Sequence, residues 1–194
     1  MMLLIVGLIL FLGLHLLPTA TDVRAGLIAR FGAGAYKAGF SILSLIGFAV
    51  IVMGYHKMQL HPGKNPVLWE PPLWTRHIAL ALMLPAMILV VAANVPSRIR
   101  SSVKHPMLMG IMIWALAHLL ANGDLASLLL FGSFLAYAIY DLKSVKARGA
   151  KGPLGNAEPK SIVNDVVVIG VGVALYLALL LGLHQYLIGV APLG

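Results

Sequence analysis

Apolar residues fill six long stretches of the chain, and short polar segments separate them. Crossing about 30 Å of hydrocarbon takes roughly 20 residues of α-helix, or fewer where the bilayer thins. The pattern therefore predicts an all-α integral membrane protein with six transmembrane helices. We find no repeat and no second domain, so one bundle is expected over residues 1–194. The predicted helices are Met1–Leu17, Tyr36–Tyr55, Trp74–Val95, Pro106–Ala121, Leu125–Tyr140 and Val163–Val190.

Local sequence features refine two of these helices. Asn122, Gly123 and Asp124 form the whole connection between the fourth and fifth helices, and all three are turn residues. We therefore expect two antiparallel neighbours, with Asn122 and Asp124 capping the helix ends. Pro85 lies inside the third helix and lacks an N–H donor, so a kink is predicted there.

The second helix carries small residues close to one face, which allow another helix to approach closely. Ordinary helix packing is the favoured interpretation, and a groove that contacts a cofactor is the alternative. These small residues are Ser41, Ser44, Gly47 and Gly54.

The first apolar stretch, Met1–Leu17, is expected to be a retained span. No basic segment precedes it, and the following LPTATD stretch has no clear cleavage signature.

Composition and charge agree with a membrane protein. The chain is 60% hydrophobic and 10% charged, and it has no cysteine for disulfides or thiolate ligands. Its formal charge of +8 would suit nucleic acid, but basic cytoplasmic loops explain it in this class, and no nucleic-acid partner is expected. Eleven of the fourteen Lys and Arg residues lie in the first, third and fifth loops, which predicts cytoplasmic odd loops and both termini outside. The eleven are Arg24, Arg30, Lys37, Arg98, Arg100, Lys104, Lys143, Lys146, Arg148, Lys151 and Lys160.

The topology separates the seven histidines into two groups. Four lie in the outer loop or near the outer interface, where ordinary interfacial polar residues are expected. His105 lies at the cytoplasmic start of the fourth helix, where it would act in a helix-start motif or meet lipid phosphate. The four outer histidines are His56, His61, His77 and His184.

His15 and His118 lie deeper in the predicted helices. His15 is 12 residues past Leu3, or ~18 Å from the outer face, and His118 is 11 residues past Met107, or ~16 Å from the inner face. In a core of about 30 Å the two would share nearly the same depth. An ionisable residue inside the membrane suggests function. Two imidazoles can hold haem iron, and an interhelical hydrogen bond is the alternative.

Arg76 follows Trp74 at an interface, where this pair commonly anchors a helix. Pairing of Arg76 with a haem propionate is the other interpretation.

Four stretches carry a family resemblance. They are LILFLGLHLLP, YKAGFSILSLIGFAVIVMGY, LWEPPLWTRH and KHPMLMGIMIWALAHLLANGDLASLLLFGSF, and they lie between residues 8 and 134. Together they resemble the NnrU family, and the spacing of the helices extends the likeness to most of the chain. The resemblance implies a role in denitrification, where the family is implicated in producing active nitrite and nitric oxide reductases.

The NnrU family is in turn similar to plant and cyanobacterial 15-cis-zeta-carotene isomerases, which are membrane proteins that carry haem b. Their pattern has a histidine late in an early membrane helix, a histidine in an Arg-His-Pro segment, and an Ala-His pair whose histidine is thirteen residues further on. These positions match His15, His105 and His118, so the resemblance implies axial ligation by His15 and His118. Lys104 replaces the arginine of the Arg-His-Pro segment, which leaves the role of that position open.

The segment HPMLMG also resembles the isoprenylcysteine carboxyl and phospholipid methyltransferases, whose Arg-His-Pro-x-Tyr-x-Gly motif binds S-adenosylmethionine. Lys104 and Leu108 depart from that motif, and loop five offers Glu158 in place of paired glutamates. A motif outside its context is weak evidence, so this class is the runner-up. A cofactor-free membrane assembly factor is a further alternative.

The sequence thus predicts a multi-pass protein of the bacterial inner membrane that binds haem b between His15 and His118. Its expected ligand is a nitrogen oxide or a hydrophobic polyene, handled through redox change or ligand exchange at iron. An isomerase-like enzyme and a haem-dependent sensor or assembly factor both stay open. Beyond the lipid bilayer, the sequence names no partner.

Overall fold

The computed structural model describes residues 1–150, 154–155 and 161–193. Over these residues the regular structure is helical, apart from one isolated bridge between Val67 and Asp124. Five helices are long and apolar enough to cross a membrane, and Pro106–Ala121 is a shorter apolar helix. The predicted all-α membrane fold is confirmed. The chain divides into two compact units, Met1–Pro66 and Val67–Gly194.

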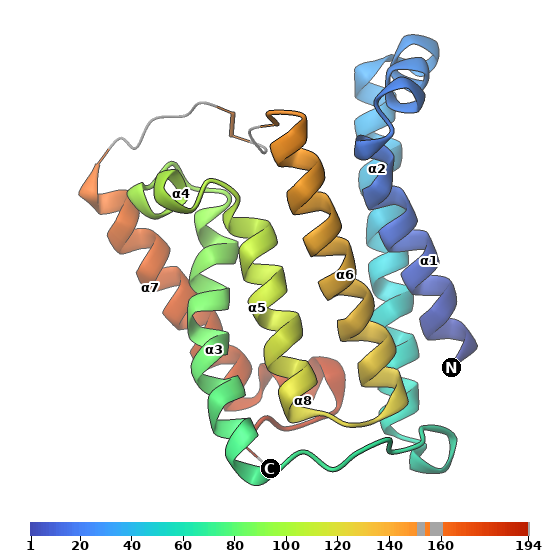
Figure 1. The fold of residues 1–194 in the computed structure, drawn as a ribbon, viewed down its shortest axis with the longest axis vertical. Helices are drawn as coiled ribbons and strands as arrows, with labels where there is room; N and C mark the ends of the chain where they lie inside the picture. Colours follow the sequence, from blue (N-terminus) through green and yellow to red (C-terminus); the bar gives the residue numbers. More distant parts are fainter. Residues whose placement is uncertain (151–153, 156–160, 194) are drawn as a thin grey trace. The chain divides into compact units, whose positions relative to one another are not determined.

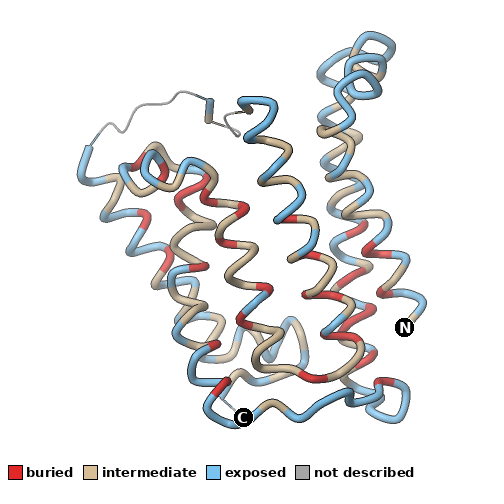
Figure 2. Tube along the Cα trace, viewed as in Figure 1, coloured by how far each residue is buried: buried red, intermediate tan, exposed pale blue. Residues whose placement is uncertain are grey.

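The first unit is a helical hairpin of α1 (Met2–Leu16) and α2 (Thr21–Gln59), joined by the short 3-10 helix η1 (Leu17–Thr19) and followed by a second, η2 (Pro62–Lys64) (Figure 1). Figure 2 shows buried residues where α1 and α2 pass each other.

Glycines allow these two helices to touch along their backbones. A Cβ added at Gly54 would lie 2.5 Å from the backbone nitrogen of Leu4, and one at Gly7 would lie 2.7 Å from that of Ile51. Gly47 meets Phe11 in the same way, at 3.1 Å from its nitrogen. The helix-packing interpretation of the small residues in the second predicted helix is therefore confirmed at Gly47 and Gly54.

The second helix begins much earlier than its apolar stretch. Sequence reasoning placed its start at Tyr36, whereas α2 begins at Thr21 and contains a non-helical residue at Gly32 (φ 82, ψ 155). Sequence reasoning placed Arg24 and Arg30 in the first loop. Because arginine is a good helix former, both residues lie inside α2 instead. The Arg24 guanidinium lies 5.8 Å from the centre of the Tyr36 ring, across the bend at Gly32.

The second unit is built around α3 (Leu73–Ala92). It packs on one side against α5 (Pro106–Ala121) and on the other against α7 (Ile162–Ala178), while α6 (Leu125–Ala147) packs against α5 (Figure 1). Glycines again set the close approaches. Gly110 of α5 faces the Ala86 carbonyl, and Gly172 of α7 faces the Ile88 backbone. The helix α3 runs through Pro85 as one element.

The turn between α5 and α6 has the predicted capping. Asn122 donates from its side-chain amide to the His118 carbonyl at 2.8 Å. Asp124 accepts from the Ser127 backbone N–H at 2.9 Å and from the Ser127 hydroxyl at 2.6 Å. The predicted antiparallel pair is confirmed, and the chain before α3 covers its turn, because the Gly123 carbonyl accepts from the Leu68 N–H at 2.8 Å.

The last predicted helix is interrupted. After α7 the chain makes a π-helical turn, η3 (Leu179–Leu183), in which Gly182 has φ 148 and ψ −23. A short helix, α8 (His184–Ile188), follows and ends at Gly189 in the left-handed region. Because glycine adopts positive φ without steric cost, these two glycines allow the chain to bend where the apolar pattern continues.

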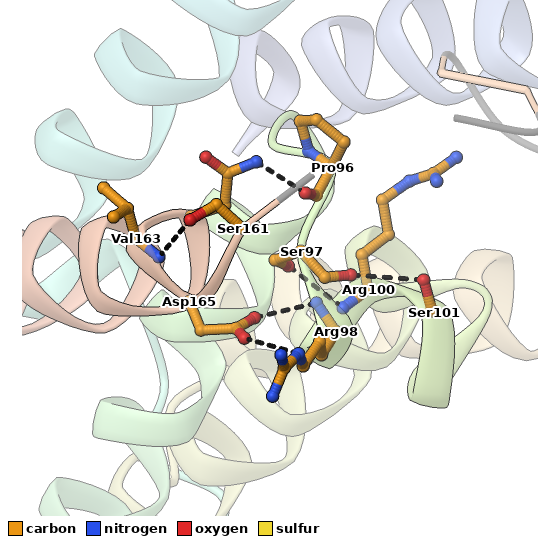
Figure 3. Close-up of polar contacts among 9 residues, drawn as sticks. Pro96, Ser97, Arg98, Arg100, Ser101, Ser161, Val163 and Asp165 are labelled. Atoms are coloured by element: carbon orange, nitrogen blue, oxygen red, sulfur yellow. Dashed lines mark hydrogen bonds and ion pairs between the residues drawn. The ribbon is translucent and has the colours of Figure 1, made fainter. Parts of the chain in front are cut away.

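The short helix α4 (Arg98–Val103) contacts the start of α7 through hydrogen bonds and an ion pair (Figure 3). The Arg98 backbone N–H donates to Asp165 at 2.7 Å, and the two side chains form an ion pair at 3.7 Å. The Asn164 amide also donates to the Pro96 carbonyl at 2.7 Å. These contacts bring the third loop and the start of α7 to the same end of this unit. The cytoplasmic location of that end stays a prediction.

Candidate functional site

His118 lies in the last turn of α5, which ends at Ala121. Its Nδ1 lies 2.8 Å from the Trp114 carbonyl oxygen, four residues earlier on the same helix. A carbonyl can only accept, so Nδ1 carries the proton and Nε2 is the nitrogen with a lone pair. This is the arrangement in which a neutral histidine binds a metal, with its second nitrogen fixed by a hydrogen bond.

Aromatic side chains hold this imidazole in place. The Phe131 ring, from α6, stacks on His118 with centroids 4.4 Å apart and planes inclined by 24°. The Trp114 indole is 5.2 Å from the imidazole and packs edge-on against Phe131 at 4.9 Å and Phe134 at 5.4 Å. Phe131 and Phe134 are buried. His118 therefore has an apolar, sterically defined setting between two helices.

His15 has the same kind of setting in the first unit. Its Nδ1 lies 2.8 Å from the Phe11 carbonyl oxygen, again four residues earlier, and its ring stacks on Phe11 at 4.1 Å. Phe40 of α2 lies 5.2 Å away. His61 makes the same type of bond to Lys57 in an exposed loop, so the bond alone does not mark a site. The shared aromatic surroundings are what relate His15 to His118.

Both histidines lie close to the C-terminal end of their helices. α1 ends one residue after His15, and α5 ends three residues after His118. The predicted spans that contain them, Met1–Leu17 and Pro106–Ala121, nearly coincide with α1 and α5. His15 and His118 belong to different units, and their pairing across one bound group stays a prediction.

His184 is the residue that sequence reasoning placed at the outer interface, without a site role. The structure brings its ring to 6.3 Å from the His118 ring, with planes inclined by 20°. Its Nδ1 lies 2.7 Å from the Val190 carbonyl oxygen, so its Nε2 also carries the lone pair. One signal in the sequence was available, because Gly182 lies two residues earlier and marks a break in the last apolar stretch.

The other two predicted site residues, Arg76 and His105, lie at the starts of two different helices, α3 and α5. Arg76 is exposed in the first turn of α3, and the neighbouring Trp74 is exposed too, as an interfacial anchor would be. His105 immediately precedes Pro106, at the opposite end of α5 from His118. A helix of this length separates the two by ~20 Å, so they cannot act on one small group.

His105 has a distinct electrostatic environment. Burial lowers the pKa of its imidazole below the ordinary value of 6.5, and the positive charges of Lys146 and Lys104 lower it further. Asp141 acts in the opposite direction. The neutral form of His105 is thus favoured at this end of α5.

The methyltransferase-like segment serves helix packing where the structure describes it. Leu108 is buried, and Gly110 provides the close approach of α5 to α3. Lys104 has a positive φ of 64° and ends α4. Glu158 lies outside the described residues.

Within the described ranges, no group of three or more His, Asp or Glu side chains could hold a metal ion. The donors available in these two settings are imidazoles. A site with two imidazoles needs its remaining ligands from the bound group itself, and the four nitrogens of a haem macrocycle meet that requirement.

In the part of the chain that the structure describes, five helices are long and apolar enough to span a membrane, and the chain is therefore a multi-pass integral membrane protein. Within that class the chain belongs to the NnrU family, since the family model described as NnrU protein matches residues 3–192. The resemblance stated from the sequence is thereby confirmed. No curated protein and no solved structure matches the chain.

Proposed function

We propose that this NnrU family member is a haem b protein of the bacterial inner membrane that would hold the haem through His118, with His15 as the second imidazole that the family resemblance implies. One observation carries the proposal. In both residues a backbone carbonyl four positions earlier holds Nδ1 at 2.8 Å, and aromatic rings orient the imidazole. Neutral, oriented imidazoles in an apolar setting are the protein contribution that haem iron requires.

The chain's residues would then perform distinct tasks. The Trp114 and Phe11 carbonyls keep the proton on Nδ1, which leaves Nε2 for iron. Phe131 and Phe134 exclude water from the His118 side of the site. Arg76 is proposed to pair with a propionate, as an exposed guanidinium near an interface can do. When bound, haem would supply one-electron chemistry and exchangeable axial positions.

The role that fits this chemistry best is sensing or assembly linked to nitrogen oxides in denitrification. The family resemblance supports it, because NnrU proteins are implicated in producing active nitrite and nitric oxide reductases. Cis–trans isomerisation of a hydrophobic polyene is the enzymatic form of the same proposal, and it would use the same histidines.

Absorption spectroscopy of the full-length protein in detergent tests this proposal. Wild type should show a low-spin b-type spectrum that changes on reduction, and His118→Ala should lose it. His61→Ala is a matched control, since His61 has the same Nδ1 bond but lies in an exposed loop. A wild-type protein without haem that binds S-adenosylmethionine would point to the methyltransferase class. A wild-type protein that binds neither would point to a cofactor-free assembly factor.

A further inference from the structure

We infer that His184 is the second imidazole of the site at His118, so that one unit, Val67–Gly194, supplies both ligands. This inference rests on the proposed haem function and changes only the second ligand, from His15 to His184. Two observations carry it, the spacing of the His118 and His184 rings and the way the chain fixes His184.

The spacing matches two ligands on opposite sides of one metal. A ligating Nε2 lies about 2.0 Å from the metal and roughly 1.1 Å from its own ring centre. Two imidazoles in line across iron therefore have ring centres roughly 6.2 Å apart, whereas a tetrahedral arrangement brings them to about 5 Å. The observed separation of His118 and His184 is 6.3 Å. This separation lies closer to the in-line value than to the tetrahedral one, so the spacing is compatible with two imidazoles on opposite sides of iron.

The protonation pattern suits the same role. Both Nδ1 atoms are bonded to backbone carbonyls, those of Trp114 and Val190, at 2.8 and 2.7 Å. In each ring, Nε2 is then the nitrogen that can bind a metal.

Two glycines with positive φ bend the backbone on either side of His184. Gly182, with φ 148, breaks the helix two residues before His184, and Gly189, with φ 86, turns the chain five residues after it. The second turn returns Val190 to the His184 ring. Both conformations favour glycine, so the two glycines of LGLHQYLIGV permit the bend that brings His184 near His118 of α5.

An ordinary aromatic pair is the competing explanation, since such pairs also have centroids 4.5–7 Å apart. The two explanations differ in what a phenyl ring at position 184 would do. His184→Phe keeps an aromatic ring for packing and removes the ligand nitrogen. A packing role would survive this change, whereas a ligand role would be lost.

The test uses full-length protein in detergent, loaded with hemin, with absorption spectra of the oxidised and reduced states. Wild type, His15→Ala and the control His61→Ala should all be low-spin. His184→Phe should shift fully to a high-spin spectrum, and millimolar imidazole should restore the low-spin form by filling the open ligand position. The thermal transition of His184→Phe without hemin should stay cooperative and fall only slightly, through loss of the hydrogen bond to Val190, which separates loss of a ligand from loss of the fold.

The reverse pattern would overturn the inference. If His184→Phe stays low-spin while His15→Ala becomes high-spin, His15 is the second ligand, and the proposed haem function stands without His184. A low-spin spectrum in the double variant His15→Ala/His184→Phe would also refute it, because another residue would then complete the site. A wild-type protein that gives no low-spin spectrum with hemin would instead refute the haem function itself.

Discussion

The imidazole of His118 stacks on the ring of Phe131, with centroids 4.4 Å apart and planes inclined by 24°. The two residues come from successive helices, α5 and α6, which the capped turn at Asn122–Asp124 holds together. The stack therefore connects the orientation of the candidate ligand to the packing of the helix pair. Substitutions in the turn or in the aromatic rings should therefore change the orientation of the His118 imidazole.

Phe131→Ala should destabilise the second unit. The Phe131 side chain is 3% exposed, and removing a buried phenyl ring typically costs about 3–5 kcal/mol through lost contacts and a cavity. We expect a fall of several degrees in the unfolding temperature in detergent. Under the proposed haem function, the absorption band of the bound haem should also broaden. Leu128→Ala, on an exposed position of the same helix, is the control and should change little. Equal effects of the two substitutions would contradict the role assigned to Phe131.

Gly54→Ala should weaken the hairpin of α1 and α2. The added methyl group would lie 2.5 Å from the Leu4 backbone nitrogen, and backbone cannot yield as a flexible side chain does. Overpacking of this kind costs about 1–3 kcal/mol. Gly13→Ala is a matched control in α1, because a Cβ there meets nothing within 4 Å. Thermal unfolding of both variants measures the difference, and an unchanged Gly54→Ala would mean that the helices separate easily.

Asp124→Ala should loosen the start of α6. Loss of this cap costs about 1 kcal/mol, and the buried Ser127 hydroxyl also loses its acceptor. Hydrogen exchange of the first amides of α6 should become faster. Asp124→Asn keeps one acceptor oxygen and should show a smaller effect. The cap assignment fails if exchange is the same in all three proteins.

His105 should contribute a pH-dependent term to stability. Its pKa in the folded protein is lowered by burial and by Lys146 and Lys104, so the unfolded state binds a proton more readily. The contribution is present above the ordinary pKa of 6.5 and is lost as pH falls through the lowered folded pKa. Unfolding temperatures of wild type and His105→Gln between pH 8 and 5 should converge or cross on the acid side.

A second variant tests the cause of that shift. Lys146→Gln removes the largest positive charge contribution, so the pKa of His105 should rise toward its ordinary value. The imidazole resonances in a pH titration by NMR report this directly. A pKa of His105 that does not move in Lys146→Gln would mean that Lys146 makes no contribution beside that of burial.

Sequence patterns predicted those parts of the fold that depend on neighbouring residues. The Asn122–Gly123–Asp124 turn was predictable because side chains of this kind cap helices within a few positions. The small residues at Gly47 and Gly54 likewise marked a helix contact. Within the described ranges, the hydrophobic pattern also located the apolar helices, because a membrane span needs a long apolar stretch.

The parts that depend on distant contacts were not predictable in this way. The early start of α2 at Thr21 is set by helix propensity in a segment whose charges suggested a loop. The approach of His184 to His118 depends on a backbone bend at Gly182, and apolar periodicity continues across that residue. A glycine in a hydrophobic run permits a bend without requiring one, so the partner of a histidine across two helices is not encoded in the local sequence.

The indole of Trp114, 5.2 Å from the His118 ring, makes the candidate site optically readable. The chain has three tryptophans, and the other two, Trp69 and Trp74, are exposed. After substitution of those two by phenylalanine, emission would report from beside His118 alone. An iron group that absorbs visible light and binds there would quench this fluorescence almost completely. The emission of Trp114 would therefore measure the occupancy of the site without an external label.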